Sequence, residues 1–459
     1  MYQIQFSSPS HMHFIGIGGI SMSGLAEVLL NSGFRVSGSD AKASPLTDRL
    51  ASLGAQIMIG QRAENILPDT DCVVYTAAIH PDNPELRAAA EQNIPLLTRA
   101  ELLGQLMRNY KTSVAVAGTH GKTTTTSMCT HILLEADLDP TVSVGGILPS
   151  IGGNIRVGGS ETFVTEACEY TNSFLSFFPT IELILNIDAD HLDFFKDLDD
   201  IIASFRRFAE LLGEEGTLII SADTAGFDTV TKDLPAEIIT FSMEGNADYT
   251  AADLSTDDRG YYSFTCLEKG SAIGSFALKV PGIHNVANAL AAIALGRKLG
   301  LDADVIRRGL LSFAGTDRRF EYKGSVCGAS VFDDYAHHPT EITATLRAAQ
   351  GMPHKKLWVA FQPHTYSRTK ALLPEFADAL TLADHVIVAE IYAARETDTL
   401  GISSADLMQE IRSKGTEAET FATFDEIEAY LKSHLEEGDM LITMGAGNIV
   451  EVGEHMLRG

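Results

Sequence analysis

The chain has 459 residues, which at about 150 residues per domain predicts roughly three domains. Hydrophobic residues make up 45% and charged residues 21%, a composition that excludes a disordered or fibrous protein. Lysine and arginine number 34 against 61 aspartates and glutamates, so the formal net charge is −27. This charge argues against a nucleic-acid polymer or an anionic membrane as a partner, because both require a basic face.

Cysteine usage and the N-terminal residues indicate the cellular compartment. The five cysteines form no CxxC pair and their number is odd, which favours a reducing cytoplasm over a disulfide scaffold or a zinc site. Residues 1–10 contain neither a basic region nor an apolar run, so we expect no signal peptide. No apolar run reaches about 18 residues, and we therefore predict no membrane insertion.

The first third of the chain alternates short apolar runs with longer amphipathic segments, as is typical of α/β folds. The expected strands cover residues 13–17, 34–39 and 71–75. The expected helices cover residues 21–31 and 83–92, and another begins at Ser44-Pro45. A polar step at 109–111 precedes a new strand at 113–117, so the first domain is expected to span residues 1–110.

The middle domain is predicted at residues 111–316 and the last at 317–459. In the middle domain we expect helices at 122–135 and 285–299, a strand at 181–187, loops at Gly145-Gly146 and Gly152-Gly153, and an antiparallel excursion within 216–280. In the last domain we expect strands at 329–333, 357–361, 386–389 and 440–444, with helices at 340–349 and through 376–380. This last pattern resembles a doubly wound parallel sheet.

A glycine-rich turn joins the first strand to the first helix. It contains Gly16, Gly18, Gly19, Ile20 and Ser21, and Asp40 ends the next strand. Glycines let the backbone approach a pyrophosphate, whose negative charge is stabilised by the amides of a helix N-terminus. The Asp40 carboxylate is at the usual place for binding a ribose. The alternative is a turn that only packs the helix on the strand. The motif favours phosphate binding and does not identify the nucleotide.

A second loop resembles a phosphate-binding P-loop. Its residues are Gly118, Thr119, His120, Gly121, Lys122, Thr123 and Thr124, between a buried strand and a helix. Backbone N–H groups would cradle the phosphates, Lys122 would reach the outer ones and the Thr123 hydroxyl would bind Mg²⁺. The first glycine lies three residues before Gly121 rather than five, a departure from the common spacing.

Two acidic segments follow buried strands in the middle domain. Glu166 lies at a strand end, where its carboxylate could complete a Mg²⁺ shell. The segment Asn186-Ile187-Asp188-Ala189-Asp190-His191-Leu192-Asp193 gathers acids around His191, which suggests a second metal position or a phosphate contact. Asn285 and Asn288 share one helix face, and their amides suit a purine edge. Capping of the helix by Asn285 is the alternative.

Cations of the last third lie at the ends of predicted elements, where doubly wound sheets bind ligands. They comprise Arg318, Arg319, His337, His338, His364 and Arg368, with Asp333 and Asp334 beside them. Arginine suits bidentate contact with a carboxylate or phosphate. A solvated basic surface is the alternative, and the acidity of the chain argues against it.

Taken together, the motifs HFIGIGGISMSGLAE, GTHGKTTTT, NIDADHLD, GIHNVANALAA, DDYAHHPTE and FQPHTYSRT resemble the Mur ligase family of peptidoglycan synthesis. The resemblance implies an α/β fold of three domains. These are a Rossmann-like domain for a UDP substrate, a central P-loop ATPase domain with a mixed sheet, and a Rossmann-like domain that brings an amino acid. The last two motifs and IYAARE imply the member that joins L-alanine to the carboxylate of UDP-N-acetylmuramate through an acyl phosphate.

The resemblance also implies roles for the residues singled out above. Lys122 would bind the ATP phosphates, Thr123 and Glu166 one Mg²⁺, and His191 a second. Asn285 and Asn288 would contact adenine, Asp334 the ATP ribose and Arg319 the γ-phosphate. His337, His364 and Arg368 would position the alanine and the acyl phosphate. The implied protein is a cytoplasmic monomer or homodimer.

Three other functions are weighed against this one. A related ligase that recycles a whole tripeptide is disfavoured by FQPHTYSRT. An NAD-dependent dehydrogenase would account for Gly16 to Asp40 but not for the P-loop. A nucleotide-binding regulator without catalysis would not account for the expected metal ligands.

Overall fold

The computed structural model describes residues 2–76, 78–192, 194–394 and 396–458. The chain divides into two compact units. The first contains Met1–Ile187, Ile202–Thr240 and Ala294–Leu301, and the second contains Asp188–Ile201, Phe241–Ile293 and Asp302–Gly459. Three β-sheets run through the chain.

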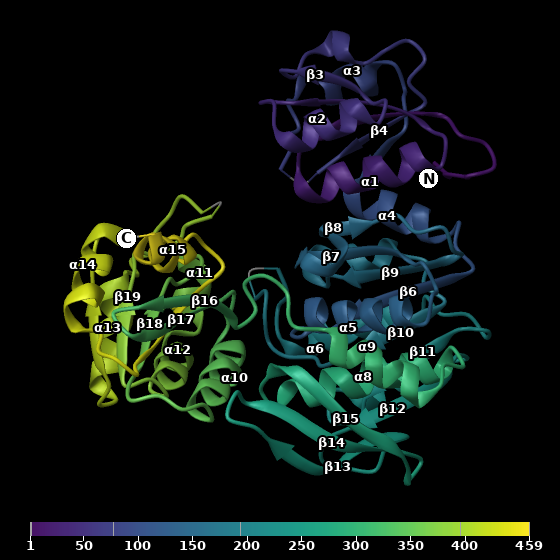
Figure 1. Ribbon diagram of the computed structural model, residues 1–459. Helices are drawn as coiled ribbons and strands as arrows, with labels where there is room; N and C mark the ends of the chain where they lie inside the picture. Colours follow the sequence, from purple (N-terminus) through teal and green to yellow (C-terminus); the bar gives the residue numbers. More distant parts are fainter. Residues whose placement is uncertain (1, 77, 193, 395, 459) are drawn as a thin grey trace. The chain divides into compact units, whose positions relative to one another are not determined.

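The first sheet is fully parallel and lies in the first unit, drawn in purple in Figure 1. Its order is β3 (Gln56–Ile59), β2 (Arg35–Asp40), β1 (His11–Ile15), β4 (Cys72–Tyr75) and β5 (Leu96–Thr98). Its helices are α1 (Ile20–Asn31), α2 (Pro45–Ser52), α3 (Pro84–Glu91) and α4 (Arg99–Met107), with a short η1 (Ala63–Asn65). Strand β1 is buried along its whole length, as expected for a central parallel strand covered on both faces.

The second sheet of the first unit carries the P-loop sequence. Its order is β11 (Thr217–Ser221), β10 (Ile181–Ile184), β6 (Thr112–Ala117), β9 (Thr162–Ala167), β7 (Thr141–Leu148) and β8 (Gly153–Arg156). These strands are parallel except β8, which runs antiparallel to β7. The other elements of the region are α5 (Lys122–Glu135), η2 (Pro149–Ile151), η3 (Tyr170–Ser176), α6 (Leu198–Ala209) and α7 (Phe227–Thr231).

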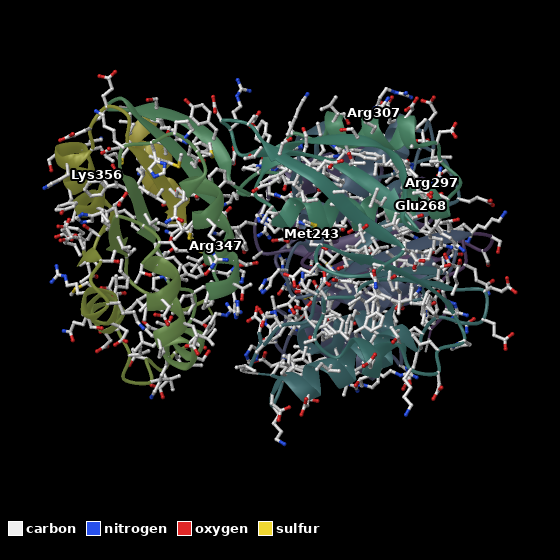
Figure 2. All side chains as sticks on the ribbon, turned by 90° about the horizontal axis from the view of Figure 1, so that it is seen from below. Met243, Glu268, Arg297, Arg307, Arg347 and Lys356 are labelled. Carbon is white, nitrogen blue, oxygen red and sulfur yellow. The ribbon has the colours of Figure 1, made fainter. Side chains whose placement is uncertain are left out.

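Strand β12 (Glu237–Ser242) leaves the first unit and ends in the second. There its end pairs with β13 (Tyr249–Thr256), and β13, β14 (Tyr261–Glu268) and β15 (Ser271–Pro281) form an antiparallel meander. Figure 2 labels Glu268 on β14, which accepts a hydrogen bond from the Tyr249 hydroxyl across the ladder at 2.5 Å. Helices α8 (His284–Lys298) and α9 (Ala303–Ser312) follow the meander. The predicted antiparallel excursion is confirmed.

The third sheet belongs to the last part of the second unit. Its order is β16 (Glu321–Val326), β17 (Ala329–Asp334), β21 (Met440–Met444), β18 (Leu357–Phe361), β19 (His385–Val388) and β20 (Glu417–Thr420), parallel except for β16. One face packs against α10 (Pro339–Gln350), α12 (Leu373–Leu380) and α13 (Ser404–Ser413), and the other against α14 (Phe424–His434) and α15 (Val450–Arg458) (Figure 1). The short α11 (Tyr366–Ala371) follows β18.

Several sequence predictions differ from this structure. The first strand ends at Ile15, because the amides of Gly16 and Ile17 turn to donate to the Ser39 carbonyl. Strand β10 ends at Ile184, three residues early. Gly145 and Gly146 lie inside β7 rather than in a loop, at the point where its ladder with β8 is interrupted. No helix among the described residues has the length and apolar character needed to cross a membrane.

Candidate functional site

The glycine-rich turn after β1 is held by the end of β2. The amides of Gly16 and Ile17 donate to the Ser39 carbonyl at 2.8 and 2.9 Å, and the Gly18 amide donates to the Asp40 carboxylate at 2.9 Å. A Cβ at Gly18 would lie 2.9 Å from that carboxylate, so any other residue there would have to displace the Asp40 side chain. Asp40 therefore shapes the turn, and its expected contact with a ribose remains a prediction. Helix α1 then begins at Ile20, preceded by Gly19 and without a side-chain cap.

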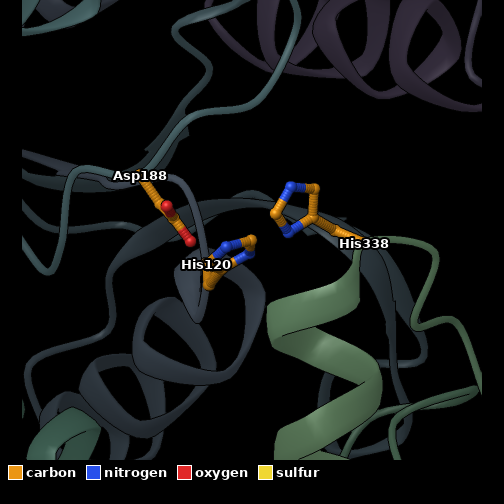
Figure 3. A group of neighbouring side chains, drawn as sticks. All are labelled: His120, Asp188 and His338. Carbon is orange, nitrogen blue, oxygen red and sulfur yellow. The ribbon is translucent and has the colours of Figure 1, made fainter. Parts of the chain in front are cut away.

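The second loop, residues 118–121, is clamped by Asn186. The amides of Thr119 and His120 donate to the backbone and side-chain oxygens of Asn186 at 3.1 and 2.8 Å, and the Asn186 amide returns a bond to the His120 carbonyl at 3.0 Å. His120 is labelled in Figure 3. Gly121 has φ +83° and caps α5, a conformation that favours glycine. The loop is thus fixed in shape, with Thr123 and Thr124 in the first turn of the helix.

Lys122 is held against the loop and a buried acid. Its ammonium donates to the carbonyls of Gly118 and Thr119 at 2.5 and 3.0 Å, and to Glu169 at 3.0 Å. Burial alone would lower the pKa of Lys122, but the negative charge of Glu169 outweighs it and raises the pKa to about 12. Lys122 is therefore a fixed cation at the start of α5. Sequence reasoning missed Glu169, because nothing in its neighbourhood marks it apart from Glu166.

Glu166 and Thr123 both border the glycines inside β7. The Gly145 amide donates to Glu166 at 2.5 Å, and a Cβ on Gly145 would lie 2.6 Å from the other carboxylate oxygen. A Cβ on Gly146 would lie 3.3 Å from the Thr123 methyl group. A carboxylate and a hydroxyl are the hard oxygen donors that Mg²⁺ prefers, so these two residues fit that ion.

In the second unit, the segment after β10 contacts the start of α10. The Thr340 amide donates to His338 Nδ1 at 3.3 Å, so Nε2 carries the ring proton and donates to the Ala189 carbonyl at 3.2 Å. The Thr340 hydroxyl donates to Asp188 at 2.7 Å. Figure 3 shows Asp188 and His338, the latter at the first turn of α10. Both residues thus have fixed orientations.

Asp190 and Arg368 form the centre of a histidine cluster in the same unit. Their side chains meet at 3.0 Å, and Arg368 also donates to His364 Nδ1 at 3.3 Å. The rings of His337 and His364 are 5.8 Å apart, and Tyr392 stacks on His364 at 5.7 Å. Sequence reasoning placed the histidines and the arginine, but gave Tyr392 no role. The last residue of the acidic motif, Asp193, and Arg395 of IYAARE lie outside the described residues.

Three ionisable groups of this cluster, Asp190, His337 and His364, have pKa values shifted from their ordinary ones. Burial would raise the pKa of Asp190, but the positive charges of Arg368 and the nearby histidines hold it well below its usual range. Burial lowers the pKa of His337, and burial together with His337 and Arg368 lowers that of His364 to about 4. Both imidazoles are therefore neutral at pH 7, beside the cation of Arg368. His191 lies next to Asp190, with the His191 amide donating to the Asp190 carboxylate at 2.6 Å.

Arg318 and Arg319 are adjacent but have different surroundings. The Arg318 guanidinium is used within the fold, donating to Asp333 at 2.9 Å and to the carbonyls of Gly445 and Gly447. Arg319 is a third exposed, and its nearest acid is Glu341 at 4.0 Å. Of the two, Arg319 has the more accessible guanidinium, and its expected contact with the γ-phosphate remains a prediction.

Asp334 is buried and bound to backbone amides. Its two oxygens accept from Phe320 at 2.8 Å and Ala336 at 2.7 Å, and burial raises its pKa to about 6. These bonds shape the turn after β17, so the expected contact with the ATP ribose remains a prediction. Asn285 and Asn288 are likewise bound to each other at 2.9 Å, and Asn285 donates to the Pro281 carbonyl at 2.7 Å.

A cavity of about 550 Å³ lies in the second unit, lined in part by the residues that directly precede Asn285 in the sequence. Its lining combines the turn before α8, Gly282–His284, with the side of α10. Apolar atoms of Ile283 and Ala344 line it, and Arg347, labelled in Figure 2, adds a cation. A cavity of this size with mixed lining is suited to a small organic ligand.

Comparison with known protein families matches three successive parts of the chain. The model described as "Mur ligase family, catalytic domain" matches residues 11–111, "Mur ligase middle domain" matches 116–296, and "Mur ligase, glutamate ligase domain" matches 318–447. The chain belongs to the Mur ligase family. The α/β fold with three sheet-containing domains is that of the family, as predicted.

Relatives and solved structures cover almost the whole chain. Proteins named UDP-N-acetylmuramate–L-alanine ligase from Lachnospira eligens and Agathobacter rectalis are 58% and 57% identical over 459 and 458 residues, covering all of both chains. The Thermotoga maritima structure of UDP-N-acetylmuramate-alanine ligase MurC has a TM-score of 0.80 at 31% identity over 98% of each chain. A murein peptide ligase from Psychrobacter arcticus has a TM-score of 0.69 at 26% identity over 98% of each chain.

Proposed function

We propose that this protein is an ATP-dependent ligase that joins L-alanine to the carboxylate of UDP-N-acetylmuramate, releasing ADP and phosphate, in the synthesis of peptidoglycan precursors. The observation that carries the proposal is the 58% identity, over all 459 residues, to a relative of that name. The P-loop with Lys122 supports the use of ATP, and the glycine-rich turn at residues 16–21 supports a nucleotide-linked substrate.

In the first step the muramate carboxylate attacks the γ-phosphate of ATP and becomes an acyl phosphate, with ADP leaving. The reaction brings anions together, so fixed cations must offset their repulsion. Lys122 and the amides of residues 118–124 are assigned to the ATP phosphates, and Arg319 to the γ-phosphate. The accessible guanidinium of Arg319 supports the latter role. Asp334 is assigned to the ATP ribose.

Mg²⁺ would be held by Thr123 and Glu166, where it would neutralise phosphate charge. His191 is assigned to a second metal position. Adenine is assigned to Asn285 and Asn288 and to the 550 Å³ cavity lined in part by the residues that directly precede them, because its lining offers apolar surface next to the amides that begin α8.

In the second step the amine of L-alanine attacks the acyl carbon, and phosphate leaves through a tetrahedral intermediate. His337, His364 and Arg368 are assigned to positioning the alanine and the acyl phosphate. Neutral imidazoles support this role. An uncharged ring repels neither the attacking amine nor the proton that this amine loses. Arg368 suits a carboxylate or phosphate oxygen, because its fork matches the geometry of either.

The second candidate is a recycling ligase that adds a tripeptide to the same nucleotide sugar. The similarity to the murein peptide ligase from Psychrobacter arcticus is the reason to test it. Phosphate release in the presence of ATP, Mg²⁺ and UDP-N-acetylmuramate distinguishes the two. We expect turnover with L-alanine and little with the tripeptide L-alanyl-γ-D-glutamyl-meso-diaminopimelate. No turnover with L-alanine would exclude the proposal, and turnover with the tripeptide alone would establish the alternative.

We further propose that the reaction takes place in the cytoplasm, which the five free cysteines support. UDP-N-acetylmuramate, L-alanine and ATP are the proposed partners. The protein is expected to act as a monomer or homodimer, and gel filtration with light scattering at working concentration tests this expectation.

A further inference from the structure

Arg99 occupies a position that is electrostatically unfavourable for a cation. It is the first residue of α4, directly after the Thr98 cap. Backbone amides at this end of a helix carry partial positive charge, which disfavours a nearby cation. Residues that break a local rule without compensation are commonly found at functional sites.

The acid nearest to Arg99 in sequence does not compensate its charge. Glu101 is used in the capping box, where its carboxylate accepts from the Thr98 amide and hydroxyl at 2.7 and 2.9 Å. Among the described residues, Arg99 makes one side-chain hydrogen bond, to the Ser21 hydroxyl at 3.2 Å, and no ion pair. Two other arginines of the first unit pair with an acid, Arg49 with Glu27 and Arg156 with Asp139.

Because Arg99 is partly buried, the lack of an ion pair costs the folded state free energy. The guanidinium is partly buried, and its desolvation lowers the pKa of Arg99. A cation removed from water is normally paired, because the loss of hydration must be offset by an anion. Although the chain has 61 acids against 34 bases, the described residues offer Arg99 no such partner, which is a specific feature of this site.

The surroundings of Arg99 indicate which anion it would meet. Its one partner, Ser21, belongs to the glycine-rich turn proposed for UDP-N-acetylmuramate. Cys168 lies close enough to influence the pKa of Arg99. Cys168 is two residues after Glu166 and next to Glu169, which holds Lys122. Arg99 therefore lies between the turn proposed for the nucleotide sugar and two residues proposed to bind ATP and Mg²⁺, Lys122 and Glu166, all within the first unit.

We propose that Arg99 binds an anionic oxygen of the nucleotide-sugar substrate. This inference rests on the proposed function. That substrate carries two anionic groups, the diphosphate and the muramate carboxylate, and the guanidinium fork matches either. In both cases the substrate supplies the anion that the fold does not, and the Ser21 hydroxyl orients the guanidinium.

The test measures binding of three ligands by isothermal titration calorimetry to the full-length protein and to Arg99→Gln. The ligands are UDP, UDP-N-acetylglucosamine and UDP-N-acetylmuramate, and only the last carries the carboxylate. We expect Arg99→Gln to weaken binding of UDP-N-acetylmuramate by about 10–100-fold, as for loss of one hydrogen bond to a charged group. Equal weakening for all three ligands assigns Arg99 to the diphosphate, and weakening for the third alone assigns it to the carboxylate.

Arg108→Gln is the matched control, because Arg108 lies at the other end of α4 and is exposed. It should leave all three affinities unchanged. Arg99→Lys keeps the charge without the fork and should recover part of the affinity, while KM for ATP and L-alanine stays near wild type. If Arg99→Gln fails to fold, Arg99→Lys provides the measurement, with weakened binding of UDP-N-acetylmuramate expected.

Unchanged affinity for UDP-N-acetylmuramate in a folded Arg99 variant would overturn the inference. Failure of the proposed function is a separate result, since the wild-type protein would then not bind UDP-N-acetylmuramate at all.

Discussion

At the scale of single residues, substitutions of Lys122 and Glu169 should affect stability and activity differently. Glu169 is 2% exposed, so Lys122→Met removes the cation facing a buried carboxylate and should cost about 3–5 kcal/mol of unfolding free energy. The same variant should lose about 10²–10³-fold in kcat, as for loss of one charge-stabilising donor. Urea unfolding and phosphate release measure the two effects.

The double variant Lys122→Met/Glu169→Gln is the control for this prediction. Removing the acid as well should recover most of the stability but none of the activity. Full activity in either variant would contradict the role proposed for Lys122. Since the pKa of Lys122 is raised, the pair contributes fully below pH 10.5, and its contribution is lost as pH rises through about 12.

We expect the buried Glu182 in β10 to make the stability of the protein depend on pH. Both its carboxylate oxygens are buried without a hydrogen-bond partner, and burial raises its pKa well above 4.5. The folded state thus favours the protonated acid, so its contribution to stability is present below pH 4.5 and is lost as pH rises. Glu182→Leu should stabilise the protein by about 1–3 kcal/mol at pH 7.5, the cost of one unsatisfied buried polar group.

Unfolding free energies of both proteins from pH 4.5 to 8 check this prediction. The advantage of Glu182→Leu should shrink toward the acid end, because the unfolded Glu182 of the wild type is then protonated too. Glu182→Gln removes the charge but keeps the polar group, so it should lose the pH dependence and gain less stability. A stability difference that does not change with pH would show that Glu182 is ionised in the fold.

The individual site residues differ in how far the sequence reveals them. Lys122 and Thr123 were predicted from the spacing of one loop, and Arg319 from its place at the end of an element and from the family resemblance. The sequence grouped Asn186 with possible metal or phosphate ligands, but its side chain clamps the P-loop. The sequence could not show this, because these hydrogen bonds depend on the register between β10 and β6. Arg99 and Glu169 were missed for the same reason, since their partners are distant in sequence.

At the scale of elements, α4 was not anticipated, although it carries Arg99. The helix follows β5 without a connecting loop, so no turn signal separates the two. Gly104 in its middle would normally be unfavourable in a helix, but an added Cβ would overlap the Ser176 carbonyl. Gly104 therefore allows α4 to pack closely against η3.

Gly104→Ala tests this packing. Alanine is the better helix former by about 1 kcal/mol, yet overpacking costs about 1–3 kcal/mol, so we expect net destabilisation. Gly213→Ala is the control, because nothing lies within 4 Å of its Cβ position, and it should change the melting temperature little. A melting temperature of Gly104→Ala at or above wild type would contradict the close approach.

Elements with strong periodicity and clear boundaries were predicted well. Helix α5 and strands β18 and β21 have the expected bounds, and each of the two strands is flanked on both sides by a polar residue or a glycine. The strand containing Gly145 and Gly146 was misjudged as a loop. Glycine pairs usually mark turns, but here the absent side chains make room for Glu166 in the fold, a tertiary contact that no local pattern records.

At the scale of the whole molecule, the two proposed nucleotide sites should respond to different ligands. UDP-N-acetylmuramate should slow amide hydrogen exchange in the turn at residues 16–21 and in the first turn of α4. A non-hydrolysable ATP analogue with Mg²⁺ should slow exchange at residues 118–124. Peptide-resolved mass spectrometry measures both, and protection of residues 118–124 by UDP-N-acetylmuramate alone would contradict the assignment.

The division of the chain into two units also affects how the protein folds while it is being synthesised. The first unit includes residues 202–240 and 294–301, and the parallel partner of β10, strand β11, comes only at Thr217–Ser221. When residues 1–187 have left the ribosome, both loops proposed to bind nucleotides are outside it, while one edge of β10 still lacks its neighbour. Unpaired strand edges recruit other chains, so the interval before residue 221 emerges is when the nascent protein most needs a chaperone.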